Sequence, residues 1–437
     1  MNLRTAFTPL LLAATAMLLS GCLKDTCKQT VTYVTYQPVY KSYEEIRSAV
    51  KPEAARALEQ PGKIYFKDAY IYISEVNEGI HVINNQDPAN PQPVAFIAVP
   101  GNHDIAMVGN KLYADSYMDQ VVIDVTNPAQ AREIGRMENV FSFGDWHPGL
   151  WADPNLGIAV DWVETEVTEE WDCANPMPWV FFERNVFSMS DVSASGVGQF
   201  ASNSNFTPTS GNSELSTGLS GSMARFAVVG DYLYMVTTSQ LIPVNISNPD
   251  APVQGNAQSI GWGIETIFPR GQHLFIGTTT GMLIYSVENP EQPTFVSSFQ
   301  HANSCDPVVV EGNYAFVTLR NGTECGGFTN QLEVVNIENL ASPRLEYVYP
   351  MFNPHGLGIR DNVLFICDGT EGLKVYDATD VSKITSNQLA HFQNIQAFDV
   401  IPLYNILLMI GADGLYQYDY SDVNNIRQIS HIPVVVE

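Results

Sequence analysis

Histidines and carboxylates recur at one position relative to a repeated turn in this sequence, and such side chains can bind metal ions. The residues seven positions before each turn are, in chain order, Pro61, His103, Pro148, Ala224, Glu265, Asp306, His355 and Ala397. His147, Asp104 and Arg225 are their immediate neighbours. Imidazole nitrogens and carboxylate oxygens are ordinary ligands of zinc and other transition ions. The pattern therefore predicts a candidate divalent-metal site formed by His103, Asp104, His147, Glu265, Asp306 and His355.

A structural role for the histidines is the alternative, and we favour it. A histidine ahead of a strand commonly hydrogen-bonds the neighbouring backbone and fixes a corner of the chain. Each candidate ligand also belongs to a different repeat, and metal–ligand distances near about 2.1 Å leave little tolerance for a wide ring. The chain has no phosphate-binding Gly-rich loop, no Gly-x-Ser-x-Gly elbow and no His-Glu-x-x-His motif. Familiar catalytic motifs thus give no support to an enzyme.

Short strands in repeated units must position these side chains. The repeated turns lie at Asp68, Asn110, Asn155, Asp231, Gln272, Asn313, Asn362 and Tyr404. They are about 41 to 49 residues apart, except for about 76 between the third and the fourth. Each unit contains four apolar strand patterns. Four strands in roughly 42 residues predict an all-β fold, a β-propeller of four-stranded blades. We favour eight blades, with seven as the alternative.

The N-terminal sequence differs in kind from the repeats. Residues 1–21 hold one positive charge and an apolar run, and the Leu-Ser-Gly-Cys ending matches a bacterial lipoprotein signal. This pattern implies cleavage before Cys22 and acylation of Cys22, for example with palmitate. Residues 22–60 are expected to be a tether and docking segment, with a strand at 30–36 and a short helix over 43–60 that is interrupted at Pro52. We expect the propeller over residues 61–437, with an insertion at about 163–222.

Composition restricts the partners. The formal net charge of −26 repels nucleic acid, so we expect no nucleic-acid partner. It is compatible with cations, glycans or proteins, and equally with solubility alone. No segment after the signal is long and apolar enough to span a bilayer, so the acyl chains would be the membrane anchor. The sequence thus predicts an exported protein that is lipid-anchored in the cell envelope, at the outer membrane.

Cysteines and tryptophans give further candidates. Cys305 and Cys325 flank the same predicted blade face and are expected to form a disulfide. A Cys27–Cys173 bond is a further possibility, and Cys367 is expected to be a buried free thiol. Trp171 and Trp179 lie among acidic residues in the insertion. Exposed aromatic side chains often contact glycans or proteins, although packing on a blade is an equal alternative.

The repeated core resembles the LVIVD-repeat family of bacterial cell-surface lipoproteins. Residues 62–65, 77–83, 87–91, 100–104 and 112–115 carry the resemblance, which extends from about residue 61 to the C-terminus. The family implies a β-propeller at the cell surface and no particular reaction. We therefore favour a non-enzymatic scaffold that binds a glycan, peptide or protein. The alternative is a metal-dependent hydrolase or lyase with its site at the mouth of the central channel.

Overall fold

The computed structural model describes residues 28–142, 151–172, 201–202, 219–301, 304, 307–321, 327 and 329–435. They form eight antiparallel sheets. They also fall into two compact units, which divide between Tyr40 and Lys41 and between Ile158 and Ala159. The smaller unit holds most of two long strands. The larger unit holds seven sheets, each containing a meander of four consecutive strands, which we call blades 1 to 7.

The blades follow one another along the chain. Blade 1 contains β3 (Pro61–Lys67), β4 (Tyr70–Glu75), β5 (Gly79–Asn84) and β6 (Gln92–Ala98), and blade 2 contains β7 (Ile105–Val108), β8 (Lys111–Ser116), β9 (Asp119–Asp124) and β10 (Arg132–Met137). Blade 3 contains β15 (Phe226–Val229), β16 (Tyr232–Val236), β17 (Gln240–Asn245) and β18 (Val253–Gln254), with β19 (Gln258–Ser259) also paired to β17. Blade 4 contains β20 (Ile264–Arg270), β21 (His273–Thr278), β22 (Gly281–Ser286) and β23 (Thr294–Gln300).

The remaining blades complete the series. Blade 5 contains β24 (Val308–Glu311), β25 (Tyr314–Leu319), β26 (Gln331–Asn336) and β27 (Arg344–Pro350). Blade 6 contains β28 (Leu357–Arg360), β29 (Val363–Cys367), β30 (Leu373–Asp377) and β31 (Gln388–Phe392), and blade 7 contains β32 (Ala397–Pro402), β33 (Ile406–Gly411), β34 (Gly414–Asp419) and β35 (Arg427–Pro433). Two 3-10 turns, η1 (Pro128–Gln130) and η2 (Ile384–Ser386), precede the fourth strands of blades 2 and 6.

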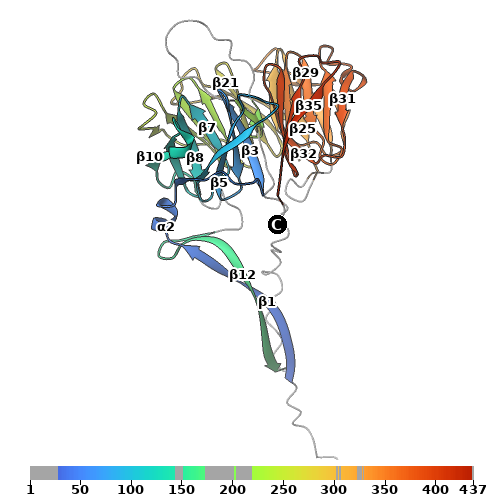
Figure 1. Cartoon of the computed structure of the whole chain (residues 1–437). Helices are drawn as coiled ribbons and strands as arrows, with labels where there is room; N and C mark the ends of the chain where they lie inside the picture. Colours follow the sequence, from blue (N-terminus) through green and yellow to red (C-terminus); the bar gives the residue numbers. More distant parts are fainter. Residues whose placement is uncertain are drawn as a thin grey trace, which may run out of the picture. The chain divides into compact units, whose positions relative to one another are not determined.

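The first strands of the seven blades form a closed ring. Each contacts the first strand of the next blade, and β32 of blade 7 contacts β3 of blade 1. The first and last blades, blue and red in Figure 1, therefore lie side by side. The predicted all-β propeller of four-stranded blades is confirmed. The described residues form eight sheets, but only seven of these sheets contain the four-strand meander of a blade. The number of blades is therefore seven, which was the alternative prediction.

The third predicted unit forms the sheet that is not a blade. Its strands β11 (Ala152–Asp153) and β12 (Gly157–Asp172) pair with β1 (Lys28–Lys41) in the order β1-β12-β11. Strand β12 is far longer than a blade strand because the alternation of valine, threonine and glutamate continues without a turn residue. The β1–β12 ribbon is visible in Figure 1, and its strands are joined by a 3.0 Å hydrogen bond between the hydroxyls of Thr32 and Thr168. The predicted N-terminal strand thus completes this sheet.

Asparagine and aspartate form the turns between the third and fourth strands. The Asn127 Oδ1 atom accepts a hydrogen bond from the Ala129 backbone nitrogen at 3.3 Å, which is an Asx turn. Blades 6 and 7 lack the Asn-Pro sequence, yet Asp380 and Asp422 accept the equivalent bonds from Ser382 and Asn424 at 3.1 and 3.0 Å. The carboxylate replaces the amide oxygen as acceptor, so the turn is preserved where the sequence motif is lost.

Glycine is required where the third strand begins. Gly79 and Gly414 have φ angles of 153° and 128°. A Cβ atom on Gly79 would lie 2.1 Å from the Ile97 carbonyl oxygen, and one on Gly414 would lie 2.0 Å from that of Ile432. In both blades the fourth strand passes too close for a side chain, which explains the recurrence of glycine here.

Blades 1 and 7 close the ring without sharing a strand. The buried amides of Asn85 and Gln417 form two hydrogen bonds of 2.9 and 2.7 Å with each other. Leu58, ahead of blade 1, forms a parallel bridge with Val434 beyond β35. A core cluster of residues from both blades, which includes Leu58, packs behind these contacts. Closure therefore depends on residues near both ends of the described chain.

A strand from the middle of the chain lies inside the ring. Strand β14 (Leu219–Ser222) pairs with the inner strand β3, and β13 (Ala201–Ser202) pairs with β14. Strand β14 also contacts β28 and β32. The last residues of the predicted insertion thus occupy the space bounded by the inner strands of blades 1, 6 and 7.

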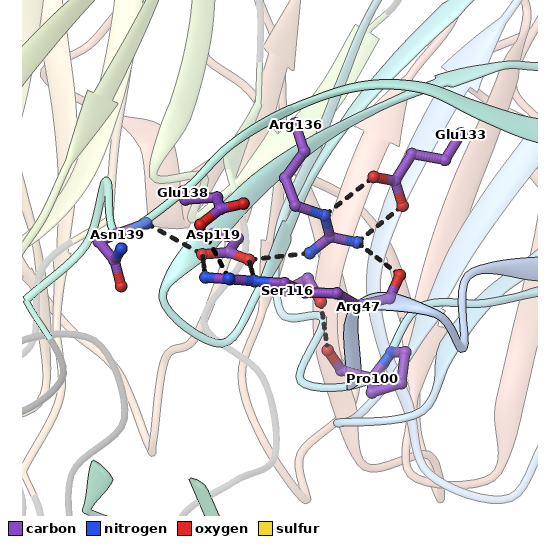
Figure 2. A network of polar contacts seen from close by, with 8 residues as sticks. All are labelled: Arg47, Pro100, Ser116, Asp119, Glu133, Arg136, Glu138 and Asn139. Carbon is purple, nitrogen blue, oxygen red and sulfur yellow. Dashed lines mark hydrogen bonds and ion pairs between the residues drawn. The ribbon is translucent and has the colours of Figure 1, made fainter. Parts of the chain in front are cut away.

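The segment ahead of blade 1 docks on blades 1 and 2. The predicted helix over 43–60 is shorter than expected: α2 (Tyr43–Arg47) ends at Arg47, and β2 (Lys51–Glu53) pairs with the outer strand β6. Pro52 is tolerated because β2 is an edge strand. Asp119 accepts hydrogen bonds from Arg47 at 2.8 Å and from Arg136 at 3.0 Å (Figure 2). This buried carboxylate fastens α2 to blade 2.

Candidate functional site

Each blade presents two faces at its strand ends. One face holds the segment that leads into the first strand together with the hairpin between the second and third strands, and we call it the corner face. The Thr279 nitrogen in such a hairpin bonds the Gly263 carbonyl in such a segment at 2.7 Å, and Tyr117 bonds Gly101 at 3.4 Å. The opposite side, which holds the turns between the first and second and between the third and fourth strands, is the turn face.

A buried ion pair joins blades 1 and 2 near the corner face. The Nζ atom of Lys63 on β3 lies 2.8 Å from the Oδ2 atom of Asp104, which precedes β7. Both side chains are buried. The backbone nitrogen of Arg225, ahead of β15, donates to the same oxygen. Burial lowers the pKa of Lys63 and raises the pKa of Asp104, while their mutual attraction opposes both shifts. Asp104 is therefore engaged in joining three blades.

Asp115 fastens the corner that precedes β7. Its Oδ1 atom accepts hydrogen bonds from the backbone nitrogens of His103 and Asp104, at 2.8 and 2.7 Å, and from Asn102 Nδ2 at 2.9 Å. Although burial alone raises the pKa of Asp115, the hydrogen bonds and the His103 imidazole hold the pKa below its usual range. The carboxylate thus replaces the backbone acceptors that a regular strand would provide.

Two other blades use a carboxylate at the end of the second strand in the same way. Asp368 accepts bonds from the backbone nitrogens of Phe352 and Asn353 at 3.0 and 2.9 Å. Glu75 accepts bonds from the nitrogens of residues 59 and 60 and from His81 Nε2. These acidic residues fix the backbone of the corner face in three blades.

Asp399 and Ser222 hold strand β14 against blades 6 and 7. The Asp399 Oδ1 atom accepts bonds from the Ser222 nitrogen and hydroxyl at 3.0 and 2.9 Å, and the Leu357 nitrogen donates to that hydroxyl at 2.6 Å. A Cβ atom on Gly356 would lie 2.0 Å from Asp399 Oδ1, so only glycine fits. Burial raises the pKa of Asp399 well above its usual range. These contacts pack β14 closely against the inner strands β28 and β32.

The structure brings some of the sequence-predicted residues together. Burial lowers the pKa of Arg225, and the carboxylates of Glu265 on β20 and of Asp104 oppose that shift. His103 has its imidazole one-third exposed, with Nδ1 3.7 Å from Asp115. His355 is buried ahead of β28, with its ring centroid 5.6 Å from that of Phe398.

Several predicted residues lie outside the described part of the chain. They are Cys22, Cys27, His147, Cys173, Trp179, Cys305, Asp306 and Cys325; Trp171 lies on β12, but its side chain is also outside. Within the described residues, no group of three or more His, Cys, Asp or Glu side chains is close enough to hold a metal ion. The metal site and the Cys305–Cys325 disulfide stay predictions. Cys367 is a buried free thiol, as expected.

An exposed tryptophan that the repeat phase did not indicate lies on the corner face. Trp262, just ahead of β20, has 80% of its surface exposed. Gly261 and Gly263 flank it with φ angles of 137° and 68°. Phe352, in the corresponding segment of blade 6, is 55% exposed. The sequence signal was the Gly-Trp-Gly triplet, in which two flexible residues surround a large apolar one.

Comparisons with known proteins identify the repeat. The model of the LVIVD repeat matches residues 101–139, 220–256 and 303–350. These ranges contain the strands of blades 2, 3 and 5, except for β19, so each match corresponds to one blade. The chain thus contains LVIVD repeats, which are propeller repeats. No curated protein matches the sequence.

Solved structures resemble the chain in fold only. A protein from Lactobacillus plantarum has 10% identity and a TM-score of 0.50, covering 79% of this chain and 88% of its own. The computationally designed Ika8 protein has 9% identity and a TM-score of 0.49, covering 88% and 92%. BamB from Moraxella catarrhalis has 7% identity and a TM-score of 0.46, covering 90% and 97%. At such identities the likeness concerns architecture and carries no function to this chain.

Proposed function

We propose that this protein is a non-enzymatic binding scaffold of the bacterial cell envelope, and that its corner face binds a glycan through Trp262. The observation that carries the proposal is the 80% exposure of this side chain. A large indole left in water forgoes the stabilisation that burial would give, roughly 2–3 kcal/mol for a side chain of this size. Exposed tryptophan is enriched where a protein contacts a partner.

The backbone around Trp262 supports binding rather than disorder. The Gly263 carbonyl accepts the Thr279 backbone bond at 2.7 Å, and a Cβ atom on Gly263 would lie 2.2 Å from the Thr279 hydroxyl. The segment is therefore pressed against its own hairpin. An aromatic side chain on a fixed backbone loses little entropy when the apolar C–H face of a sugar ring stacks on it.

The inner corners favour binding over catalysis for the same face. Asp104 pairs with Lys63, and Asp115 accepts three hydrogen bonds from the adjacent corner. Strand β14 packs inside the ring through Ser222 and Asp399. These polar groups serve contacts within the protein, whereas Trp262 and Phe352 on this face are open to a partner.

Replacing Trp262 with alanine is expected to weaken glycan binding at least tenfold, because the stacking surface is lost. The measurement applies the purified full-length protein to an array of neutral and acidic bacterial oligosaccharides. Trp262→Phe should retain part of the affinity. The matched control is Tyr404→Ala, which removes a 75% exposed aromatic side chain from the turn between β32 and β33 on the turn face. Equal binding by Trp262→Ala, or binding only to a protein, would contradict the glycan proposal.

Envelope attachment is proposed to occur through Cys22. Among the described residues, no helix is long and apolar enough to cross a membrane. Acylation of Cys22 after signal cleavage would supply the hydrophobic anchor that stable attachment requires. In a bacterium that processes lipoproteins and is fed an alkyne fatty acid, the full-length protein should be labelled and sediment with membranes. Cys22→Ser should be unlabelled and soluble, whereas Cys27→Ser should behave as the natural protein does. Persistent labelling of Cys22→Ser would refute the assignment.

A further inference from the structure

We propose that the turn face carries a second binding site, a pocket between blades 4 and 5 that takes a hydroxy-carboxylate such as a sugar acid. The pocket has a volume of about 400 Å³. Its polar walls come from the β20–β21 turn, with Arg270, Gln272 and His273, and from the end of β24, with Glu311. Val310 and Leu340 add apolar surface. Volumes from about 300 to 1,000 Å³ with a few convergent polar groups are usual for small-molecule sites.

Arg270 supplies an uncommitted positive charge in this acidic protein. Within the described part of the chain its guanidinium forms no hydrogen bond and no ion pair, although it is half-buried. By contrast, Arg136 donates to both Asp119 and Glu133. Burial lowers the pKa of Arg270, and only Glu311 opposes that shift. A half-buried guanidinium with free donors fits a carboxylate, which it can bind through two parallel hydrogen bonds.

Glu311 is fixed in the pocket by blade 6. Its Oε1 and Oε2 atoms accept hydrogen bonds from the backbone nitrogens of Asp361 and Asn362, at 3.0 and 2.8 Å. Both donors lie in the β28–β29 turn with φ angles of 51° and 63°, which aim successive nitrogens at the carboxylate. Each carboxylate oxygen can still accept a further bond. Glu311 thus faces the same pocket as Arg270 while remaining unpaired with it.

This separation defines the class of ligand. A group that binds both residues needs an anion for Arg270 and a hydroxyl donor for Glu311. His273 adds an imidazole that makes no hydrogen bond within the described residues, and burial lowers its pKa, so the ring is neutral near pH 7 and can also bond a hydroxyl. A dianion such as phosphate would face repulsion from Glu311. A monocarboxylate with adjacent hydroxyls satisfies all three side chains.

Calorimetric titration of the purified full-length protein with D-glucuronate tests the proposal. We expect saturable binding by glucuronate and by its methyl glycoside, and at least tenfold weaker binding by D-glucose, which lacks the carboxylate, and by inorganic phosphate. Methyl glucuronide as a good ligand would place the end of an acidic glycan in the pocket, whereas preference for the smaller glycerate would favour a free hydroxy acid.

Variants locate the binding and separate it from folding. Arg270→Gln should weaken glucuronate binding at least tenfold, and Glu311→Gln should weaken glucuronate more than acetate. Arg132→Gln, which alters an exposed arginine on β10, is the matched control and should bind as the natural protein does. Circular dichroism checks that each variant is folded. No binding of any carboxylate, or unchanged binding by folded Arg270→Gln, would overturn the proposal. Because Trp262 lies on the corner face, Trp262→Ala should leave glucuronate binding intact.

Discussion

Replacing Asp115 with alanine is expected to lower the free energy of unfolding by about 3–5 kcal/mol. The fully buried Asp115 carboxylate accepts bonds from the backbone nitrogens of His103 and Asp104 and from the Asn102 amide. Without it, these donors stay buried with no acceptor, and the corner that holds Asp104 against Lys63 loses its support. Urea unfolding followed by circular dichroism measures the effect.

Asp115→Asn is the matched variant for this prediction. The amide oxygen of asparagine can still accept the hydrogen bonds that Oδ1 of Asp115 accepts. The free energy of unfolding should therefore fall by less, about 1–2 kcal/mol. An exposed carboxylate of a turn, Asp422, provides a second control, since Asp422→Ala removes one Asx bond from the surface. If Asp115→Ala were as stable as Asp422→Ala, the corner would not depend on this carboxylate.

Acid is expected to destabilise the protein through His355. Burial, with a smaller contribution from the nearby positive charge of Arg320, lowers the pKa of His355 from 6.5 to about 3. The folded protein therefore keeps the imidazole neutral, while the unfolded chain binds a proton below about pH 6.5. The stability associated with neutral His355 is complete above pH 6.5. It is lost as the pH falls toward 3, at about 1.4 kcal/mol per pH unit.

Denaturant titrations of the natural protein and of His355→Gln at pH 7 and pH 4.5 measure this contribution. Between these values the natural protein should lose about 2–3 kcal/mol more than the variant, because glutamine takes up no proton. His431→Gln is the control, since this histidine lies exposed on β35. Equal acid sensitivity of the natural protein and His355→Gln would show that the imidazole becomes protonated without unfolding.

Repeat chemistry made most of the fold predictable. Turn residues recur in register, and strand patterns between them are local, so the blades follow from short segments such as Leu112–Asp115. Strand β12 was not predictable as a partner of β1, because that pairing joins residues more than a hundred positions apart. The same applies to β14, whose short sequence gives no indication that it pairs with β3. Long-range pairing is thus where the sequence prediction of the fold fell short.

The candidate sites were predicted less completely. The count of seven positions back from each turn located His103, Glu265 and His355 near the corner face. It did not predict which neighbouring side chains they and Asp104 contact. Asp115 and Lys63, which decide how Asp104 is used, lie on other strands and outside the counted phase. Trp262 was missed because its proposed role depends on the exposure of its side chain. The strand pattern predicts which residues are buried in the blades, but not which loop residues are exposed. Arg270 became notable only because it has no hydrogen-bond or ion-pair partner among the residues that the structure describes.

The closure between blades 1 and 7 governs when the chain can finish folding. Gln417 must reach Asn85, and Val434 must reach Leu58, before the first blade has blade 7 as its second neighbour. Nearly the whole polypeptide must therefore be synthesised first, and the final docking spans hundreds of residues, a slow step for loop-closure entropy. The ring of a nascent chain therefore stays unclosed until the last strand, β35, has been synthesised and can dock. Such a delay fits the export that the proposed acylation of Cys22 requires.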